Sequence, residues 1–377
     1  MTTHHISEDD LYRTSTQFRL WTFSPEALQS MRQNTNTAAT ERAKQYLPQQ
    51  DASTFMTCDE ERRLVQRYCD TIASTAAHLK WASHVKATAI QYLKRFYLTN
   101  SVHTYPPKEI YKSVLFLASK TEGVHMTLGD FARSISSKPE QILAPEYKII
   151  QALRFTLDVR QPIRGLRGSY MELESLAHGK FEPMPFIAAS KTPRDLQRDM
   201  ASLAAPTPSC LSDWSPTSPG EEKALVARAW AAYTCARTIL DNAALLTDAY
   251  LLFTPPQIHL AALKLSDTPL LDFYISLHVP STHPAGPQIL ETISRAAELM
   301  RDFDKATQIM SKDERVSVER RLEDVRDPST VDLVRRHEEA KRGGAVEGVV
   351  DEQLAKKRRL AREASLKEGE DLFGPSL

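Results

Sequence analysis

The sequence predicts an all-α protein that contains two helical bundles in tandem. Apolar residues recur at three- and four-residue spacing in many segments of the 377-residue chain, which is the period of amphipathic helices. Glycine, which tight turns between strands often need, occurs only 12 times. Five helical patterns between residues 57 and 160 are followed by five more between residues 161 and 310. We therefore expect two five-helix domains, preceded by an N-terminal segment with a helix (1–56) and followed by a charged helix or tail (311–377).

The N-terminal segment contains a clear helix start. Ser24 is suited to cap a helix, and Pro25 is suited to its first position. We expect this helix to end at the Asn- and Thr-rich stretch 34–40. Trp21 lies just before the helix. Its favoured role is a core contact within its own domain, and the alternative is direct contact with a partner.

The first domain begins with a capping-box pattern at Thr57 and Glu60, which predicts a helix to about Leu79. The four helices that follow are expected at residues 85–99, 107–120, 128–135 and 139–155. In the helix over 107–120, apolar residues cover more than half of the circumference, which indicates burial between other helices. Lys120 ends that apolar run, and a cation at the rim of a buried helix requires an explanation.

The second domain repeats this plan, with helices expected at residues 164–177, 221–253, 255–265, 270–277 and 286–303. The first two of them are separated by an insertion, residues 183–219. It contains seven prolines and is therefore expected to form neither helix nor strand. Its four Ser/Thr-Pro sites would suit proline-directed kinases, at Thr192, Thr207, Ser215 and Ser218. A solvated spacer is the favoured alternative for this insertion.

Charge and composition limit the function classes. Lys plus Arg and Asp plus Glu both number 48, and this balance argues against sequence-independent binding to nucleic acid. Residues 312–371 carry 31 charged side chains and no aromatic one, so we expect an exposed helix or disorder there. The basic run Lys356–Arg359 within this block is either a nuclear-import signal or part of a solvated face.

The sequence contains no catalytic or metal-binding pattern. A Gly-rich phosphate loop, the motifs HExxH, GxSxG and paired CxxC, and the protein-kinase signatures are all missing. The four cysteines are scattered, which predicts reduced thiols and no zinc site. We also find neither a signal peptide nor an apolar run of membrane-spanning length. We therefore expect a soluble, intracellular protein without cofactor or metal.

Three segments, in this order, resemble the cyclin box: KRFYLTNS (94–101), LFLASK (115–120) and PEYKIIQALRFTL (145–157). Three further segments agree: QFRLWTFSPEAL (17–28), LRFTLDVRQPIRG (153–165) and LLTDAYLLFTPPQIHLAAL (245–263). The chain thus resembles the cyclin family, and within it the cyclin H group. This resemblance implies tandem five-helix cyclin folds with extra N-terminal and C-terminal helices, and no catalytic residue.

The resemblance also implies what the chain would bind. The expected partner is a cyclin-dependent kinase, the catalytic subunit of the CDK-activating kinase, which the chain would activate. A RING-finger assembly factor and the TFIIH core are the further expected partners, and the nucleus is the expected location. The complex would phosphorylate the activation loops of other cyclin-dependent kinases and the C-terminal tail of RNA polymerase II.

The same resemblance implies a kinase-binding interface. In cyclins, the positions that match Lys120 and Glu146 lie side by side and hydrogen-bond main-chain groups of the kinase. The other residues expected at the interface are Phe116, Leu117, Tyr147, Ile150 and Trp21. Charges that are partly desolvated at an interface fix its register, while apolar neighbours supply the free energy. The alternative for Lys120 and Glu146 is an intramolecular salt bridge of little energetic value.

Two departures from the family pattern accompany this resemblance. Family members commonly carry an acid at the position of Gly123. The stretch 61–68 lacks the Met, Leu and Trp patch with which cell-cycle cyclins dock substrates, so docking of that kind is not expected. Two other functions stay open: a cyclin that pairs with an elongation or Mediator kinase, and a TFIIB-like DNA-binding core. The second lacks its zinc ribbon and a basic groove.

Overall fold

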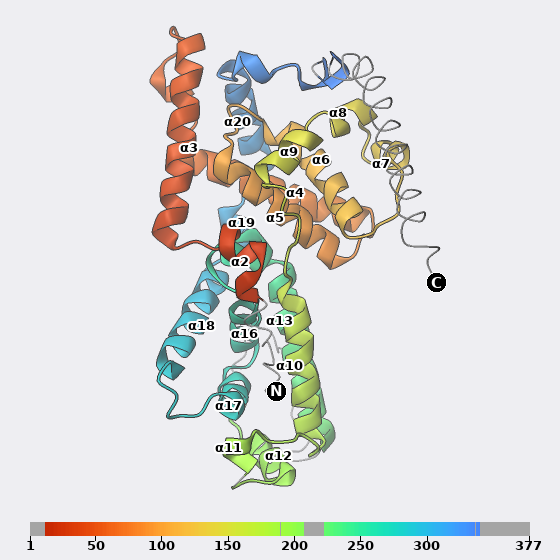
Figure 1. The fold of residues 1–377 in the computed structure, drawn as a ribbon, viewed down its shortest axis with the longest axis vertical. Helices are drawn as coiled ribbons and strands as arrows, with labels where there is room; N and C mark the ends of the chain where they lie inside the picture. The colour runs from red at the N-terminus through yellow and green to blue at the C-terminus, as the bar shows by residue number, and fades with distance from the viewer. Residues whose placement is uncertain (1–11, 189, 207–221, 336, 340–377) are drawn as a thin grey trace, which may run out of the picture.

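The computed structural model describes residues 12–188, 190–206, 222–335 and 337–339. In these residues the regular structure is helical, without a strand, and the helices form two bundles along the long axis of the molecule (Figure 1). This arrangement confirms the predicted all-α fold class. None of the described helices is long and apolar enough to cross a membrane.

The N-terminal helices are α2 (Thr16–Trp21) and α3 (Pro25–Tyr46), and Ser24 caps α3 as predicted. The predicted end of α3 at 34–40 is wrong, because the helix runs through this stretch. Thr35 donates its hydroxyl to the Leu98 carbonyl at 2.7 Å, and Asn36 donates to the Met56 carbonyl at 3.1 Å. These tertiary hydrogen bonds outweigh the low helix propensity of Asn and Thr.

The first bundle consists of α4 (Cys58–His78), α5 (Ser83–Thr99), α6 (Pro107–Thr121), α7 (Leu128–Ser134), α8 (Pro139–Leu143) and α9 (Glu146–Ala152). The capping box of Thr57 with Glu60 is present. The single helix predicted over 139–155 is instead two short helices. Pro145 separates them, because proline has no N–H to donate to the carbonyl four residues earlier.

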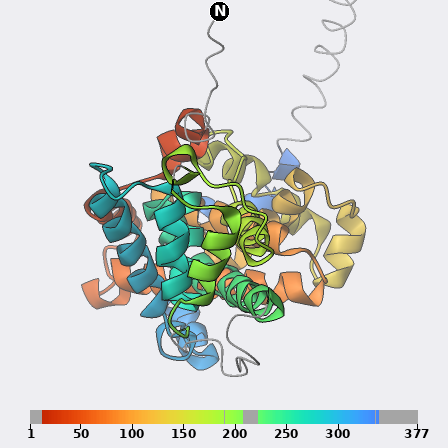
Figure 2. The same ribbon diagram turned by 90° about the horizontal axis from the view of Figure 1, so that it is seen from below.

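The second bundle consists of α10 (Pro162–Ala177), α13 (Glu222–Asp241), α14 (Ala243–Leu246), α15 (Ala249–Leu252), α16 (Pro255–Ser266), α17 (Thr268–His278) and α18 (Gly286–Arg301). Helix α16 lies among α10, α13, α17 and α18, and the view from below shows these green and teal helices gathered together (Figure 2). The single helix predicted over 221–253 is interrupted twice. At the second break the carbonyls of Leu246 and Thr247 accept hydrogen bonds from Gln66 and Lys94 of the first bundle.

The insertion contains helices that the sequence analysis excluded: α11 (Pro185–Ala188) and α12 (Pro193–Ala201). Thr192 caps α12, and Pro193 occupies its first position, where a missing N–H is harmless. Leu196 and Met200 of α12 are fully buried, so this part of the insertion belongs to the core. The Ser/Thr-Pro sites at Thr207, Ser215 and Ser218 lie outside the described residues.

The C-terminal helices are α19 (Lys305–Gln308) and α20 (Lys312–Asp324), and α20 packs against α4 of the first bundle. The expected helix is present at α20, but it is not fully exposed, because it buries Val318 and Leu322. Its charged side chains bond to the first bundle: Arg321 pairs with Glu60, and Tyr68 donates to Glu319. The basic run Lys356–Arg359 lies outside the described residues.

The cysteines differ from one another. Cys58 and Cys69 are free thiols, as the scattered positions predicted. Cys235 is disulfide-bonded, and this corrects the expectation of reduced thiols. Spacing along the chain does not show which distant cysteines the fold brings together, so the sequence carried no signal for this bond.

A buried ion pair in the second bundle leads to a test of stability. Arg228 donates to both carboxylate oxygens of Asp267 at 2.7 and 2.9 Å and to the Ala204 carbonyl at 2.8 Å. Both side chains are buried, so Arg228→Ala leaves an unpaired carboxylate in the core and is expected to lower the free energy of unfolding by about 3–5 kcal/mol. Urea unfolding measures this change. Lys191→Ala, which breaks the exposed pair with Asp199, is the control and is expected to change stability by less than about 1 kcal/mol.

Two buried histidines predict sensitivity to acid. Burial lowers the pKa of His103 and of His259 to about 4, from an ordinary value of 6.5. As the pH falls from 6.5 towards 4, the unfolded chain takes up these two protons and the folded chain does not. Each histidine therefore lowers the free energy of unfolding by up to about 1.4 kcal/mol per pH unit in this window. Urea unfolding at several pH values is expected to show a shallower slope for His259→Gln, and an unchanged slope would contradict the assignment.

Candidate partner-binding site

The position of Lys120 is set by the buried helix α6. Phe116, one turn earlier, is buried, and its ring stacks on Phe131 with centroids 5.2 Å apart. The Lys120 ammonium lies 4.9 Å from the centroid of the Phe116 ring. This cation–π contact holds the charged group at the rim of an otherwise apolar helix.

The chain turns sharply after Lys120. Gly123 has a φ of +73°, which side chains other than glycine rarely adopt, and the N–H of Val124 donates to the Ser119 carbonyl at 2.8 Å. Glu122 accepts a hydrogen bond from the Thr88 hydroxyl at 2.5 Å. The end of α6 is therefore fixed against α5, and Lys120 projects from a rigid base.

Glu146 comes from the first turn of α9, where a carboxylate is favoured by the partial positive charge of the helix N-terminus. Its carboxylate forms an ion pair with the Lys120 ammonium. The side chains are 42% exposed for Lys120 and 18% exposed for Glu146. The structure thus brings the two sequence-predicted residues together. In the isolated chain they form the intramolecular salt bridge that the sequence analysis gave as the alternative. Since a half-exposed pair contributes little to stability, either group can change partner at small cost.

The apolar neighbours of this pair differ in exposure. Tyr147 on α9 is 66% exposed, and Ile150, one turn later on the same helix, is half-buried. Phe116 and Leu117 are buried at 6% and 3% exposure, so they support the pair from below. We call Lys120, Glu146, Tyr147, Ile150 and Phe155 the α6–α9 rim.

Phe155 is the residue of this rim that the sequence analysis missed. It is 67% exposed, although it is a large apolar side chain. Arg154 and Phe155 have φ angles of 54° and 56°, a backbone conformation that bulky residues rarely adopt. This turn ends α9 and directs Phe155 outwards, while Leu153 keeps the core position. The helical spacing of apolar residues predicted that Leu153 is buried, but it cannot predict a left-handed backbone at Arg154 and Phe155. The exposure of Phe155 therefore could not be predicted from the sequence.

Trp21 lies in the core of the chain itself, which corrects its assignment to the interface. It is 1% exposed, and its indole N–H donates to the Thr156 hydroxyl at 2.9 Å. The guanidinium groups of Arg95 and Arg154 lie 5.1 and 5.4 Å from its ring centroid. A side chain enclosed in this way has no free surface for a partner, and the core role is the correct one.

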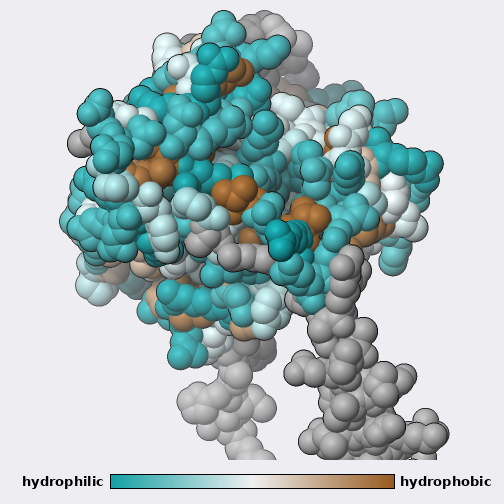
Figure 3. Space-filling view, turned by 90° about the horizontal axis from the view of Figure 1, so that it is seen from above, coloured by the Kyte–Doolittle hydropathy of each residue, from teal (hydrophilic) through white to brown (hydrophobic). Residues whose placement is uncertain are grey.

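The surface around the first bundle is mostly hydrophilic. Figure 3 views the molecule from the end that this bundle forms and shows hydrophobic side chains as separate spots among hydrophilic ones. Within the described residues no group of three or more His, Cys, Asp or Glu is placed to hold a metal ion. The arrangement at the α6–α9 rim, with one cation, one anion and exposed aromatic rings, is suited to binding another protein.

Comparisons with known proteins agree with this fold. The cyclin N-terminal domain matches residues 26–158, and the cyclin C-terminal domain matches residues 161–301. A chain in the structure of the CAK complex from Chaetomium thermophilum, bound to ATP-gamma-S, is 33% identical with a TM-score of 0.70. That match covers 90% of this chain and 96% of the other. Two successive domain matches and this likeness define the class: the chain belongs to the cyclin family.

The chain is also similar to individual members of this family. Cyclin CCL1 of Saccharomyces cerevisiae is 28% identical over 73% of this chain, and cyclin mcs2 of Schizosaccharomyces pombe is 31% identical over 48%. The matches span 63% and 58% of those two relatives, so the chain covers about 60% of their length. A chain in the structure of the yeast TFIIK complex (Kin28/Ccl1/Tfb3) is 26% identical with a TM-score of 0.54, over 77% of this chain and all of the other.

The weak Lys120–Glu146 pair leads to a test of its role in the isolated protein. If the pair is available to a partner, Glu146→Gln and Lys120→Met lower the free energy of unfolding by less than about 1 kcal/mol each. Urea unfolding of the purified chain measures both changes. A loss of about 3 kcal/mol or more would instead make the pair part of the folded core and remove it from the binding surface.

Proposed function

We propose that this chain is a regulatory cyclin that binds and activates a cyclin-dependent kinase, within a CDK-activating kinase module of the TFIIH type. Its two cyclin folds would span residues 57–160 and 161–310. Membership of the cyclin family supports the proposal, and so does the likeness to chains of the CAK and TFIIK complexes. The observation that carries it is the α6–α9 rim, where a weakly bonded pair of opposite charges adjoins exposed aromatic rings.

Each group at the rim has a role in the proposed interface. The Lys120 ammonium donates to main-chain carbonyls of the kinase, and the Glu146 carboxylate accepts from its main-chain N–H groups. Tyr147, Ile150 and Phe155 lose their contact with water, and each aromatic ring can bury about 150–250 Å². The charged groups fix the register, and the apolar groups supply most of the free energy. A stable pair of this kind buries on the order of 2,000 Å² or more.

The proposed activation is a conformational shift. The chain binds the kinase conformer in which the mobile helix with the active-site Glu is turned inwards, and it thereby favours that conformer. The inward helix completes the Lys–Glu pair that positions the phosphates of ATP. All catalytic groups then belong to the kinase, and the cyclin is a regulatory subunit without an enzymatic reaction of its own.

The further partners follow from the same proposal. A RING-finger assembly factor and the TFIIH core would join the pair in the nucleus. The substrates would be the activation loops of other cyclin-dependent kinases and the tail of RNA polymerase II. The likeness to a chain of the TFIIK complex supports a role in transcription.

Charge reversal tests the proposed interface. Lys120→Glu and Glu146→Lys are each expected to weaken binding to the kinase subunit by at least about tenfold, because a reversed charge faces an unsuitable main-chain group. Isothermal titration calorimetry measures binding, and circular dichroism checks that both variants remain folded. Lys191→Glu reverses a charge of similar exposure on the second bundle and is the matched control. Normal binding by both rim variants would place the interface elsewhere.

Affinity purification of the tagged chain from its own cells identifies the kinase. The eluate is assayed on a polymerase-tail heptad peptide and on an activation-loop substrate. Activity on both substrates, together with TFIIH subunits, is the expected result. Activity on the tail peptide alone would indicate a cyclin of an elongation or Mediator kinase, and the absence of any co-purified kinase would contradict the proposal.

A further inference from the structure

The hydroxyl of Tyr250 begins a chain of hydrogen bonds that runs from the second bundle to the end of α6. Tyr250 lies on α15 and is 5% exposed, and its O–H donates to the side-chain carbonyl of Gln161 at 3.1 Å. Gln161, in the linker just before α10, donates its amide N–H to the hydroxyl of Thr88 at 3.1 Å. Thr88, which is fully buried on α5, donates in turn to the Glu122 carboxylate at 2.5 Å. We call these four residues the Tyr250–Glu122 relay.

The hydrogen bonds of the relay have one possible direction. A carboxylate can only accept hydrogen bonds, so the single hydrogen of the Thr88 hydroxyl is directed to Glu122. The Thr88 oxygen must then accept, which turns the amide N–H of Gln161 towards it and leaves the Gln161 carbonyl to accept from Tyr250. Because each residue donates to the next one, loss of any member leaves a buried polar group without its partner.

Glu122 connects the relay to the α6–α9 rim. It lies two residues after Lys120, and its N–H donates to the Ala118 carbonyl at 3.0 Å. Glu122 therefore closes the last turn of α6, which is the turn that carries Lys120. The hydrogen bond from Thr88 holds this turn against α5, while the Lys120 side chain stays 42% exposed. The relay thus acts on the backbone that supports Lys120 and shares no residue with the rim.

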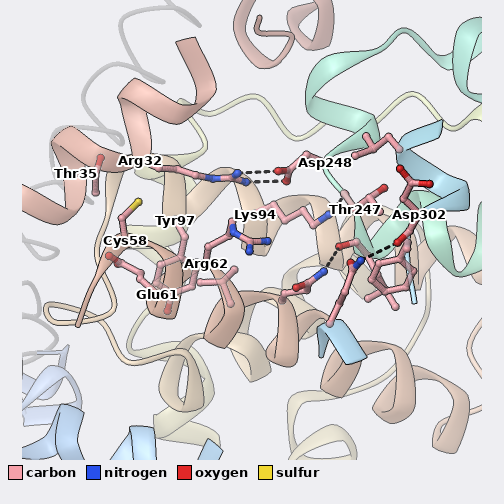
Figure 4. A pocket seen from close by; sticks show the side chains of 16 residues that line it. Arg32, Thr35, Cys58, Glu61, Arg62, Lys94, Tyr97, Thr247, Asp248 and Asp302 are labelled. Atoms are coloured by element: carbon pink, nitrogen blue, oxygen red, sulfur yellow. Dashed lines mark hydrogen bonds and ion pairs between the residues drawn. The ribbon is translucent and has the colours of Figure 1, made fainter. Parts of the chain in front are cut away.

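The first bundle also holds the segment that carries Tyr250. Lys94 of α5 donates to the Thr247 carbonyl, and Arg32 of α3 donates two hydrogen bonds of 2.7 Å to the carboxylate of Asp248 (Figure 4). Tyr250 follows two residues later in the chain. These bonds bring its hydroxyl to the linker when the second bundle is docked on the first, and without this docking the relay loses its first donor.

We propose that Tyr250, Gln161 and Thr88 are positioning residues for the α6–α9 rim. Through Glu122 they fix the last turn of α6, so the placement of Lys120 depends on the docking of the second bundle. This role rests on the proposed function, because it concerns the surface that would bind the kinase. Coupling between two sites is reciprocal, so a kinase bound at the rim also strengthens the contact between the two bundles.

Hydrogen exchange of the full chain, measured by mass spectrometry, tests the relay without the kinase. Tyr250→Phe keeps the ring but removes the donor, and it is expected to accelerate exchange in the segment 118–124 by about threefold or more. Tyr274→Phe is the matched control, because Tyr274 is 9% exposed and its hydroxyl donates to Glu172 within the second bundle at 2.6 Å. The control is expected to leave exchange in 118–124 unchanged. Unchanged exchange in Tyr250→Phe, or equal acceleration by both variants, would overturn the proposal.

Variants of Thr88 test the middle of the relay. Thr88→Val removes the hydroxyl at nearly constant volume and is expected to accelerate exchange in 118–124 by about threefold or more, whereas Thr88→Ser keeps the hydroxyl and is expected to stay within about twofold of the original chain. A purely steric role of the Thr88 methyl would give the opposite order and would contradict the relay. If Thr88→Val does not fold, as judged by circular dichroism, Gln161→Met at a half-buried position takes its place, with the same acceleration expected.

A double-mutant cycle connects the relay to binding. Isothermal titration calorimetry measures the affinity of the kinase subunit for the original chain, for Tyr250→Phe, for Lys120→Met and for the double variant. Tyr250→Phe alone is expected to weaken binding by about threefold, but by less than about 1.5-fold once Lys120 has been replaced, because its effect passes through Lys120. Equal losses in both backgrounds would overturn the positioning role, since a general loss of stability acts without regard to Lys120.

Different results would contradict the interface and the relay. If Lys120→Glu and Glu146→Lys both bind the kinase normally, the proposed interface is wrong, and the positioning role is wrong with it. If both reversals weaken binding but Tyr250→Phe changes neither exchange nor affinity, the interface stands and the role of the relay is wrong.

Discussion

The burial of α5 is the constraint on which the structure depends. Thirteen of its 17 residues are buried, and they include charged and polar side chains. Two of these buried cations find their partners in the backbone of distant segments: Arg95 donates to the Asp158 carbonyl at 3.2 Å, and Lys94 donates to the Thr247 carbonyl. A buried donor without an acceptor would be costly, so α5 fixes both the linker between the bundles and the segment of the second bundle that joins α14 to α15.

The α6–α9 rim is a consequence of this arrangement. Helix α5 contacts both α6 and α9, and the charged ends of these two helices therefore meet at one edge of the first bundle. The core side holds Phe116 and Leu117 rigid, while the solvent side leaves Tyr147 and Phe155 uncovered. A rigid base below weakly bonded charges is the property that a surface needs if it is to bind another protein without rearranging its own fold.

The helical period and the cap residues predicted much of this fold from the sequence. The predicted starts of α5 and α6 differ from the observed ones by no more than two residues, because apolar spacing and prolines mark them clearly. The predictions were wrong where tertiary contacts determine whether a helix ends or is buried. At Thr247 the backbone leaves the helix, and the Thr247 carbonyl accepts a hydrogen bond from Lys94 of the first bundle. The sequence predicts that helix α20 is exposed to solvent, because its charged residues outnumber its apolar ones. In the structure, some of these charges form ion pairs with the first bundle.

The candidate site was predictable in part for the same reason. Lys120 and Glu146 stand out in sequence as charges at the ends of apolar helices, and the structure brings them together. The exposure of Phe155 depends on a left-handed backbone at two consecutive residues, and the burial of Trp21 depends on Arg95 and Arg154, which are far from it in sequence. Neither property is encoded in local spacing.

Helix α20 follows the second bundle in the sequence, but it packs against the first bundle in the structure. It closes over α4, and Arg326, just beyond it, forms two hydrogen bonds of 2.6 and 2.8 Å with Glu109 of α6. Thr330 donates to the Thr104 carbonyl at 2.5 Å. On the ribosome the first bundle is made early, but these contacts form only after the whole second bundle has been translated. Until α20 has been translated, the part of α4 that it covers remains exposed to solvent. Transiently exposed apolar surface promotes aggregation, so the first bundle needs most protection in this interval.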